Sequence, residues 1–371
     1  MKRAIIAGMA ASVVIGVGSV YAEEEASWTD TVKVSGDVRL RHESFDQDGK
    51  TDRHRQRVRA RVSVKGEVNA SMKAGLRVAS GSDDPVSTNQ SFDDAFSSKG
   101  FQLDKVYLTW AVAEGVDVTG GKMGKPWINV ADLIWDGDLN PEGFAASMST
   151  GDATRLLATI GYFWVDEDSS SSDDLLLYVG QAALESTSDL GTLVVGASIY
   201  NYENIEGSPA LYDEDLFGNT GVDLVDGVGD DAVVTEVFAE DFQIVEGFAS
   251  ISTKAGDLPV KLYAQVAVNS ADDSGEDTAY LGGIKLGKAK KPGQVELGYN
   301  YRSIEKNAVL GTFTDSDFGG GGTNAEGHKL MGKVAVADNV SAGVALFLNQ
   351  LDPDGADTDY ARLQVDLVAK F

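Results

Sequence analysis

The chain has 371 residues with 42 Gly, 7 Pro, no Cys and 43% hydrophobic residues, and its formal net charge at pH 7 is −27. This composition is neither that of a disordered chain nor that of a collagen, and the absence of Cys excludes disulfides, thiolate nucleophiles and Cys-ligated metals. A chain this acidic does not bind nucleic acid through its overall electrostatic field.

The first 22 residues have the organisation of a signal peptide. Lys2 and Arg3 precede an apolar run from Ala4 to Val20, and Val20-Tyr21-Ala22 offers a cleavage site. We expect residues 1–22 to be removed and residues 23–31 to form a short N-terminal lead. A retained anchor is the alternative, but the run is short and only mildly hydrophobic. No later run of about 18 apolar residues predicts a spanning helix.

From residue 32 to residue 371, apolar and polar side chains alternate in segments that turn residues separate. A period of two predicts β-strands. The expected strands lie at 32–42, 54–67, 70–81, 101–112, 115–125, 143–150, 153–165, 174–185, 190–203, 242–254, 258–269, 277–288, 293–304, 326–337, 339–350 and 358–371. This even number of strands predicts a 16-stranded antiparallel transmembrane β-barrel over residues 32–371.

The connections between these strands are expected to alternate strictly between tight turns and longer loops. The longer loops are placed at 43–53, 82–100, 126–142, 166–173, 204–241, 270–276, 305–325 and 351–357. Short turns at one end and long loops at the other are typical of outer-membrane barrels. Both termini would then lie at the short-turn, periplasmic end.

One row of side chains on each strand is expected to face lipid, as for Val58, Ala60, Val62 and Val64. The last strand ends in an aromatic residue, Phe371, which is predicted to close the barrel. A soluble all-β protein is the alternative, but the terminal Phe, the loop asymmetry and the absence of a blade repeat argue against it. The segments 174–185 and 242–254 alternate poorly, so their faces stay unassigned.

A ladder of arginines on the first two strands occupies the face opposite the valines. Its members are Arg39, Arg41, Arg55, Arg57, Arg59 and Arg61, and Lys65 continues the row on the second strand. In a barrel that face is the lumen, and like charges at this density need water or carboxylate partners. We therefore predict a basic wall of a pore; an ordinary solvated strand face is the alternative.

The loop 126–142 combines two Trp and two Pro with several apolar residues, which is unusual for a loop in water. We expect it to fold inward and narrow the lumen. Its carboxylates, Asp132, Asp136, Asp138 and Glu142, would then oppose the arginines. A loop packed over the rim without a role in conduction is the alternative. Acidic outer loops favour cations and the arginines favour anions, so weak cation selectivity or none is expected.

Two motifs resemble the "putative porin" family of Gram-negative outer membranes. The first is Leu133 to Gly143, and the second is Tyr299-Asn300-Tyr301-Arg302 followed by Asp315 to Thr323 and by Gly327-His328. The resemblance implies a barrel in the cell outer membrane that lets small hydrophilic solutes and ions diffuse passively, without a cofactor. Its partners would be outer-membrane lipid and lipopolysaccharide. Many general porins trimerise, which makes a homotrimer compatible with the resemblance. A substrate-specific channel, or a plugged structural or surface-binding barrel, remains an alternative.

Enzymatic and metal sites are not predicted. The histidines His42, His54 and His328 lack zinc-protease spacing, no G-x-S-x-G turn occurs, and His42 is expected at a lipid-side rim without a serine partner. The acidic loop 204–241 fails as an EF-hand because Leu224 stands where Glu is needed. Whether that loop binds divalent cations stays open.

Overall fold

The computed structural model describes residues 31–167, 169, 173–226, 233–272 and 274–371. The predicted signal peptide and the lead up to residue 30 lie outside these residues. Within the described ranges, no helix is both long and apolar enough to cross a membrane. The described residues include the short 3₁₀ turns η1 (Asp94–Phe96) and η3 (Gly311–Phe313), both of which lie in loops.

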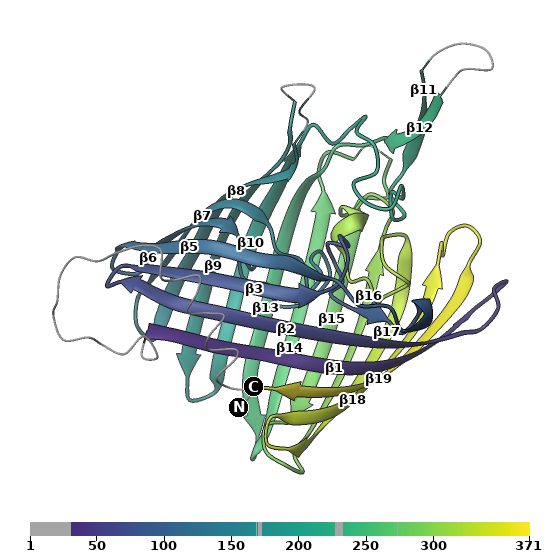
Figure 1. The fold of residues 1–371 in the computed structure, drawn as a ribbon. Helices are drawn as coiled ribbons and strands as arrows, with labels where there is room; N and C mark the ends of the chain where they lie inside the picture. The colour runs from purple at the N-terminus through teal and green to yellow at the C-terminus, as the bar shows by residue number, and fades with distance from the viewer. Residues whose placement is uncertain (1–30, 168, 170–172, 227–232, 273) are drawn as a thin grey trace.

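Sixteen long strands form a closed antiparallel barrel, which confirms the predicted fold (Figure 1). They are β1 (Val32–Gln47), β2 (Arg53–Asn69), β3 (Met72–Ser80), β5 (Phe101–Ala113), β6 (Val116–Lys122), β7 (Glu142–Thr150), β8 (Thr154–Asp166), β9 (Leu175–Ser188), β10 (Gly191–Glu203), β13 (Gln243–Ala255), β14 (Leu258–Asn269), β15 (Thr278–Gly287), β16 (Val295–Ile304), β17 (Ala325–Ala337), β18 (Val340–Leu351) and β19 (Thr358–Lys370). Each strand pairs with the next around the ring. Closure pairs every strand of the barrel sheet on both sides, as a sheet that spans a membrane requires.

The seam of the barrel joins β1 to β19, from Asp37 opposite Lys370 to Gln47 opposite Tyr360. At its end, the Gly36 amide donates to the Phe371 carbonyl at 2.9 Å, and the Phe371 amide donates to the Gly36 carbonyl at 3.0 Å. A Cβ at Gly36 would lie 2.5 Å from Cζ of the Phe371 ring. The terminal ring therefore covers a glycine on the first strand.

Burial alternates along the strands as a barrel demands. On β19, Arg362 and Gln364 are each 2% exposed, whereas Val365 and Leu367 are each 46% exposed. The two rows lie on opposite faces because successive side chains of a strand point to opposite sides. The charged row lines the interior and the apolar row covers the outside.

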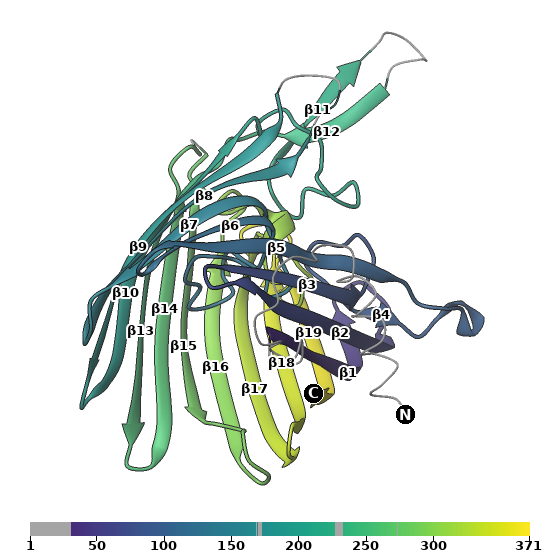
Figure 2. The same cartoon turned by 60° about the vertical axis from the view of Figure 1, so that its left-hand side comes forward.

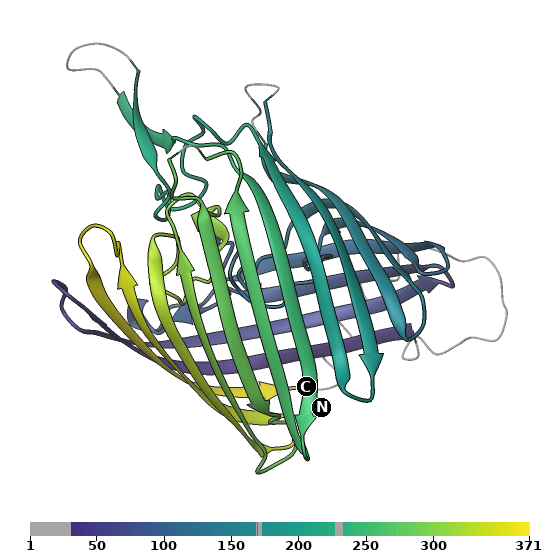
Figure 3. The same ribbon diagram turned by 180° about the vertical axis from the view of Figure 1, so that it is seen from behind.

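Two features of the long loops were not predicted. A two-residue strand, β4 (Gln90–Ser91), pairs with β2 beside Arg57 and Val58. The loop 204–241 contains a hairpin of β11 (Gly221–Asp226) and β12 (Val233–Phe238). Figures 2 and 3 show this hairpin projecting from the long-loop end of the barrel.

The expected strict alternation of connection lengths is wrong at two places. β1 continues to Gln47 and β2 begins at Arg53, so the connection between them is short, although a longer loop was placed at 43–53. At the opposite end, the connection between Gly287 and Val295 is longer than the tight turn that was expected. The strands of a hairpin end where the ladder of backbone hydrogen bonds ends. Polar residues near the rim can still belong to that ladder, so they do not mark the end of a strand in the sequence.

Two strands with poor alternation, β9 and β13, carry several apolar residues on the inner row. Leu175, Leu177 and Val179 of β9 are buried on the inward side, and so are Ile244 and Phe248 of β13. Most of these residues belong to a core that includes the loop residues Trp127 and Trp135. The alternation fails because both faces of these strands meet apolar surroundings.

Candidate pore lining

The six arginines of the predicted basic wall lie on the inward rows of β1 and β2, and most of them are paired. Glu43 on β1 is fully buried and accepts from Arg55, from Arg362 at 2.6 Å and from Gln364 at 3.0 Å. Asp37, also on β1, accepts from Arg59 at 2.8 Å and from Arg61 at 2.8 Å. Both carboxylates lie on the same strand wall as the arginines, a source of neutralisation that was not predicted.

Arg41 links the seam to the loop 305–324. Its guanidinium donates to both oxygens of Asp366, at 2.7 and 2.8 Å, and to Asp317 at 3.1 Å. Burial alone would raise the pKa of the Asp317 carboxyl, but the charges of Arg362 and Arg41 outweigh it and hold that pKa well below its usual range. Asp317 is therefore ionised, and it fastens its loop to this wall.

Arg39 and Arg57 have the longest carboxylate contacts of the six. Arg39 lies 3.9 Å from Asp366, and Arg57 lies 4.0 Å from Glu43. Both donate to Asn89 instead, Arg39 to the side-chain oxygen at 2.6 Å and Arg57 to the carbonyl at 3.3 Å. The loop 81–100 therefore approaches the basic wall at these two residues.

Asp138 of the loop 123–141 meets the arginines as the sequence suggested. Its carboxylate lies 3.0 Å from Arg61 and 3.9 Å from Arg59, and it accepts from the Thr88 hydroxyl at 3.0 Å. Burial raises the pKa of this carboxyl, but Arg59 and Arg61 outweigh burial and lower it below its ordinary value. One end of the loop is thus tied to β2.

Asp132 lies apart from the six arginines and meets a different pair of cations. Arg302 of β16 donates to its carboxylate at 2.6 Å, and Lys329 of β17 donates at 2.9 Å. Burial raises the pKa of Asp132, but these two cations outweigh it and hold the pKa well below the usual range. The loop therefore spans from β2 to β16 and β17.

Asp136 lies between these two anchors without a cation within ion-pair distance among the described residues. It accepts the amide protons of Asp138 at 2.6 Å and of Ser316 at 3.1 Å. Burial, together with the negative charge of Asp315, raises the pKa of its carboxyl well above the ordinary value. Asp136 therefore joins two loops and does not face the arginines.

Glu142 also departs from the prediction. It is the first residue of β7 rather than a loop residue, it is 62% exposed in its side chain, and Lys122 of β6 donates to it at 2.6 Å. Its neighbour by period two, Phe144, is 57% exposed on the outside. Glu142 thus belongs to the outer surface and does not oppose the arginines.

The apolar residues of the loop 123–141 pack on the inner wall of β8 to β10. Trp135 is 1% exposed, and its ring lies 5.1 Å from Tyr200 of β10 and 5.1 Å from Trp127. Trp127 in turn lies 5.7 Å from Phe163 of β8. Gln181 of β9 exchanges two hydrogen bonds with the backbone of Ile128, at 2.7 and 2.9 Å. These contacts bury the indole rings that seemed misplaced in a loop.

Sequence reasoning missed several inward cations, among them Arg302, Lys329 and Arg362. Arg302 is completely buried and Arg362 is 2% exposed, both in ion pairs. The signal was present in Tyr299-Asn300-Tyr301-Arg302, where aromatic residues face outward and the alternate residues face inward. The alternation of side chains along the strand would have placed Arg302 in the lumen, as it did for the arginines of β1 and β2.

The expectation that His42 lacks a serine partner is wrong. His42 Nε2 lies 3.0 Å from Ser44 Oγ, and His42 Nδ1 lies 2.6 Å from the Gln56 amide group. His54 Nδ1 lies 2.9 Å from the same serine oxygen. β1 and β2 align these residues directly, since His42 pairs with Gln56 and Ser44 with His54, on the outward face.

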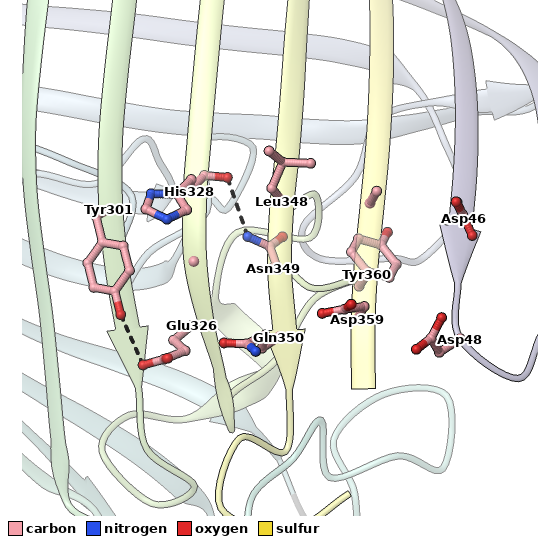
Figure 4. Close-up of a pocket in the computed structure, with 12 residues that line it drawn as sticks. Asp46, Asp48, Tyr301, Glu326, His328, Leu348, Asn349, Gln350, Asp359 and Tyr360 are labelled. Atoms are coloured by element: carbon pink, nitrogen blue, oxygen red, sulfur yellow. Dashed lines mark hydrogen bonds between the residues drawn. The ribbon is translucent and has the colours of Figure 1, made fainter. Parts of the chain in front are cut away.

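A hollow of about 660 Å³ lies at the long-loop ends of β16 to β19 and of β1 (Figure 4). Four carboxylates line it, those of Asp46, Asp48, Glu326 and Asp359. The Tyr301 hydroxyl donates to Glu326 at 3.0 Å. Among the residues that the structure describes, no group of three or more His, Cys, Asp or Glu could hold a metal ion.

The family is decided by comparison with known proteins. A family model described as "Putative porin" matches residues 46–220 and 247–371. The chain belongs to the "putative porin" family. No curated protein matches the sequence.

Solved structures of outer-membrane porins share the fold at low sequence identity, and the chain covers nearly their whole length. OprB of Pseudomonas putida has a TM-score of 0.59 at 11% identity, with 92% of this chain and 95% of that chain covered. OmpF of Salmonella typhi, in complex with daunomycin, has a TM-score of 0.52 at 10% identity, with 92% and 97% covered. A trimer form of OmpT of Vibrio cholerae has a TM-score of 0.50 at 12% identity, with 92% and 99% covered. The chain therefore belongs to the "putative porin" family and has the fold of solved outer-membrane porins.

Proposed function

We propose that this porin forms a water-filled channel through which small hydrophilic solutes and ions diffuse down their gradients. The observation that carries the proposal is a closed barrel of sixteen strands whose inner wall is charged and whose outer wall is apolar. A barrel of this size leaves an aqueous lumen. Its charged inner wall favours polar solutes over apolar ones.

The constriction is formed by the loop 123–141 folded into the lumen. Support comes from its contacts with three separate parts of the inner wall: Asp138 with β2, Ile128 with β9, and Asp132 with β16 and β17. Arg39, Arg41, Arg55, Arg57, Arg59 and Arg61 form the basic wall of the pore. The acidic lip consists of Asp132 and Asp138. Asp136 is left out because its carboxylate accepts from backbone amides, and Glu142 is left out because it lies on the outer surface.

Outside the barrel, the apolar rows face outer-membrane lipid, and the rim meets lipopolysaccharide. Residues 1–22 act as the export signal. We place the long-loop end at the cell surface and the short-turn end in the periplasm, as in outer-membrane barrels generally. A homotrimer is proposed from the likeness to the trimer form of OmpT.

The test is electrical. The refolded chain 23–371 is inserted into a planar bilayer under a KCl gradient, and single-channel steps and the reversal potential are recorded. Ohmic steps that scale with salt support a diffusion porin. Saturable block by one solute class would indicate a substrate-specific channel, and silence from correctly folded protein would indicate a plugged barrel.

A second candidate function, ester hydrolysis at the membrane surface, rests on His42 and its two neighbours. Ser44 would be the nucleophile, His42 Nε2 the base, and Gln56 would orient the imidazole if its oxygen faces Nδ1. A fluorophosphonate probe distinguishes the candidates. If the probe labels the folded protein and Ser44→Ala abolishes the labelling, the result favours the hydrolase. If the probe does not label the protein, the channel remains the one supported function.

A further inference from the structure

A cavity of about 530 Å³ lies inside the barrel, between the loop 123–141 and the inward rows of β2, β3, β5 and β6. Four cations line it: Lys65, Arg77, Lys105 and Lys125. Asp117 is the carboxylate among its lining residues. The cavity is therefore positive, in a chain whose net charge is strongly negative.

A β-bulge on β5 produces the central feature of this cavity. The pairing with β3 shifts so that Arg77 lies opposite Lys105 and Val78 lies opposite Leu103. Asp104 is the additional residue at this shift. A bulge of this kind re-aims side chains, so that Asp104 and Lys105 both serve the interior.

The carboxylate of Asp104 is already occupied. One oxygen pairs with Arg77, and the other accepts from the Asn140 side chain at 2.7 Å. Arg77 is thereby neutralised, and Asp104 is 8% exposed. Lys105 consequently gains no ion pair from its own neighbour in the chain.

Three ammonium groups in the cavity have no carboxylate within 4.0 Å among the described residues: those of Lys65, Lys105 and Lys125. The Lys125 ammonium donates instead to the carbonyls of Asp136 and Leu139, at 2.5 and 3.2 Å, which fixes its position. The Lys105 ammonium lies against Gly124, where a Cβ would come within 2.8 Å of it. Glycine leaves the space that this ammonium occupies.

Beside the apolar Leu76, Met123 and Pro126, the lining contains neutral hydroxyl groups. They belong to Ser35, Ser63, Tyr107, Thr109, Thr119 and Ser147. Hydroxyl and ammonium groups together are donors for oxyanions, and Lys acts as a point charge that suits phosphate and carboxylate alike.

We propose that this cavity is a binding site for small multivalent oxyanions, phosphate or carboxylate in class, which pause there on their way through the pore. The proposal rests on the channel function above and specifies the class of solute it handles. The three unpaired ammonium groups carry a charge of +3 and the Asp117 carboxylate carries −1. The site therefore has a net charge of +2, which an anion of charge −2 balances. Lys105 is central, and Lys65 and Lys125 flank it.

The experiment measures two quantities on the same folded protein with inorganic phosphate as the probe: block of single-channel current in KCl, and equilibrium binding of labelled phosphate in detergent. We expect saturable binding and block in the wild type. Lys65→Gln and Lys105→Gln should each weaken both by about fivefold or more, because each removes one unit charge near the anion. Lys105→Arg should retain them.

The matched control is Lys285→Gln, which removes a cation from β15, where Lys285 faces Lys261 across the strand pair and lies over Tyr263. It should leave phosphate affinity unchanged. Heat-modifiable migration checks that each variant is folded. Equal losses in Lys285→Gln and Lys105→Gln would overturn the site in favour of a diffuse field.

Two outcomes separate this proposal from the channel function. Ohmic KCl current with neither block nor binding of phosphate would overturn the anion site and leave the porin intact. Saturable phosphate binding that Lys105→Gln weakens, in a protein without current, would support the site and refute the open pore.

Discussion

Replacing Trp135 by Ala should release the loop 123–141 from the inner wall while leaving the barrel folded. The indole is 1% exposed and packs on Trp127, Tyr200 and Phe313, none of which belongs to the seam of the sheet. A Trp side chain buries roughly 150–250 Å², which at about 25 cal/mol per Å² is worth roughly 4–6 kcal/mol. Measured Trp-to-Ala costs in cores are about 3–5 kcal/mol.

The lost packing free energy should shift the equilibrium between the docked and the undocked loop, because the contacts of Trp135 join the loop 123–141 to the inner wall. Since about 1.4 kcal/mol corresponds to a factor of ten, the undocked population should rise by roughly 10² to 10⁴. The assay is the rate of proteinase cleavage within residues 123–141 of the folded protein, which tracks the open population when opening is fast. Channel recordings should also show larger or noisier steps.

The control is Trp110→Ala, which removes the same side chain from the outward face of β5, where it is 53% exposed. It should leave cleavage within the loop at the wild-type rate. If folded Trp135→Ala is cleaved no faster than the wild type, the reasoning is refuted. The ion pairs of Asp132 and Asp138 would then hold the loop without help from the aromatic contacts.

Three further outcomes are expected. Arg302→Ala leaves Lys329 as the remaining cation beside Asp132 and Asp315, so the free energy of unfolding measured in urea should fall by about 3–5 kcal/mol. Arg155→Ala breaks a pair with Glu185 in which the arginine side chain is 42% exposed, so the same free energy should fall by less than about 1 kcal/mol. Equal losses in the two variants would contradict the argument from burial. Gly36→Val should lower the free energy of unfolding by about 1–3 kcal/mol, because its Cβ would lie 2.4 Å from the Arg61 carbonyl oxygen. Gly282→Val places its Cβ in open space and should change this free energy little. An unchanged stability of Gly36→Val would mean that the backbone around Gly36 moves to make room. The pKa of Asp136 is raised above its ordinary 3.8, so the native state holds this proton longer and stability is lost as the pH rises from 3.8 through the raised value. Asp136→Asn removes this titration, so its stability relative to the wild type should rise between pH 3.8 and neutral pH, and a constant difference across that range would argue against the assignment.

The sequence by itself determined the barrel. Period-two alternation is a local property of each strand, and it survives wherever one face meets water and the other meets apolar surroundings. It therefore placed all sixteen barrel strands and put the six arginines on the inward row. It left the faces of β9 and β13 unassigned, because apolar residues such as Leu177 and Ile244 also lie on their inward rows.

The tertiary structure decided which ion-pair partner each inward carboxylate meets. Parity tells which face a side chain occupies but not what lies across the lumen, and Glu43 pairs with Arg362, 319 residues further along the chain. Asp132 likewise pairs with Arg302 at a separation of 170 residues. Such pairs depend on how the ring closes and where the loops fold within it, which no local pattern encodes. For the same reason Asp138 meets the basic wall while Asp132 and Asp136 do not.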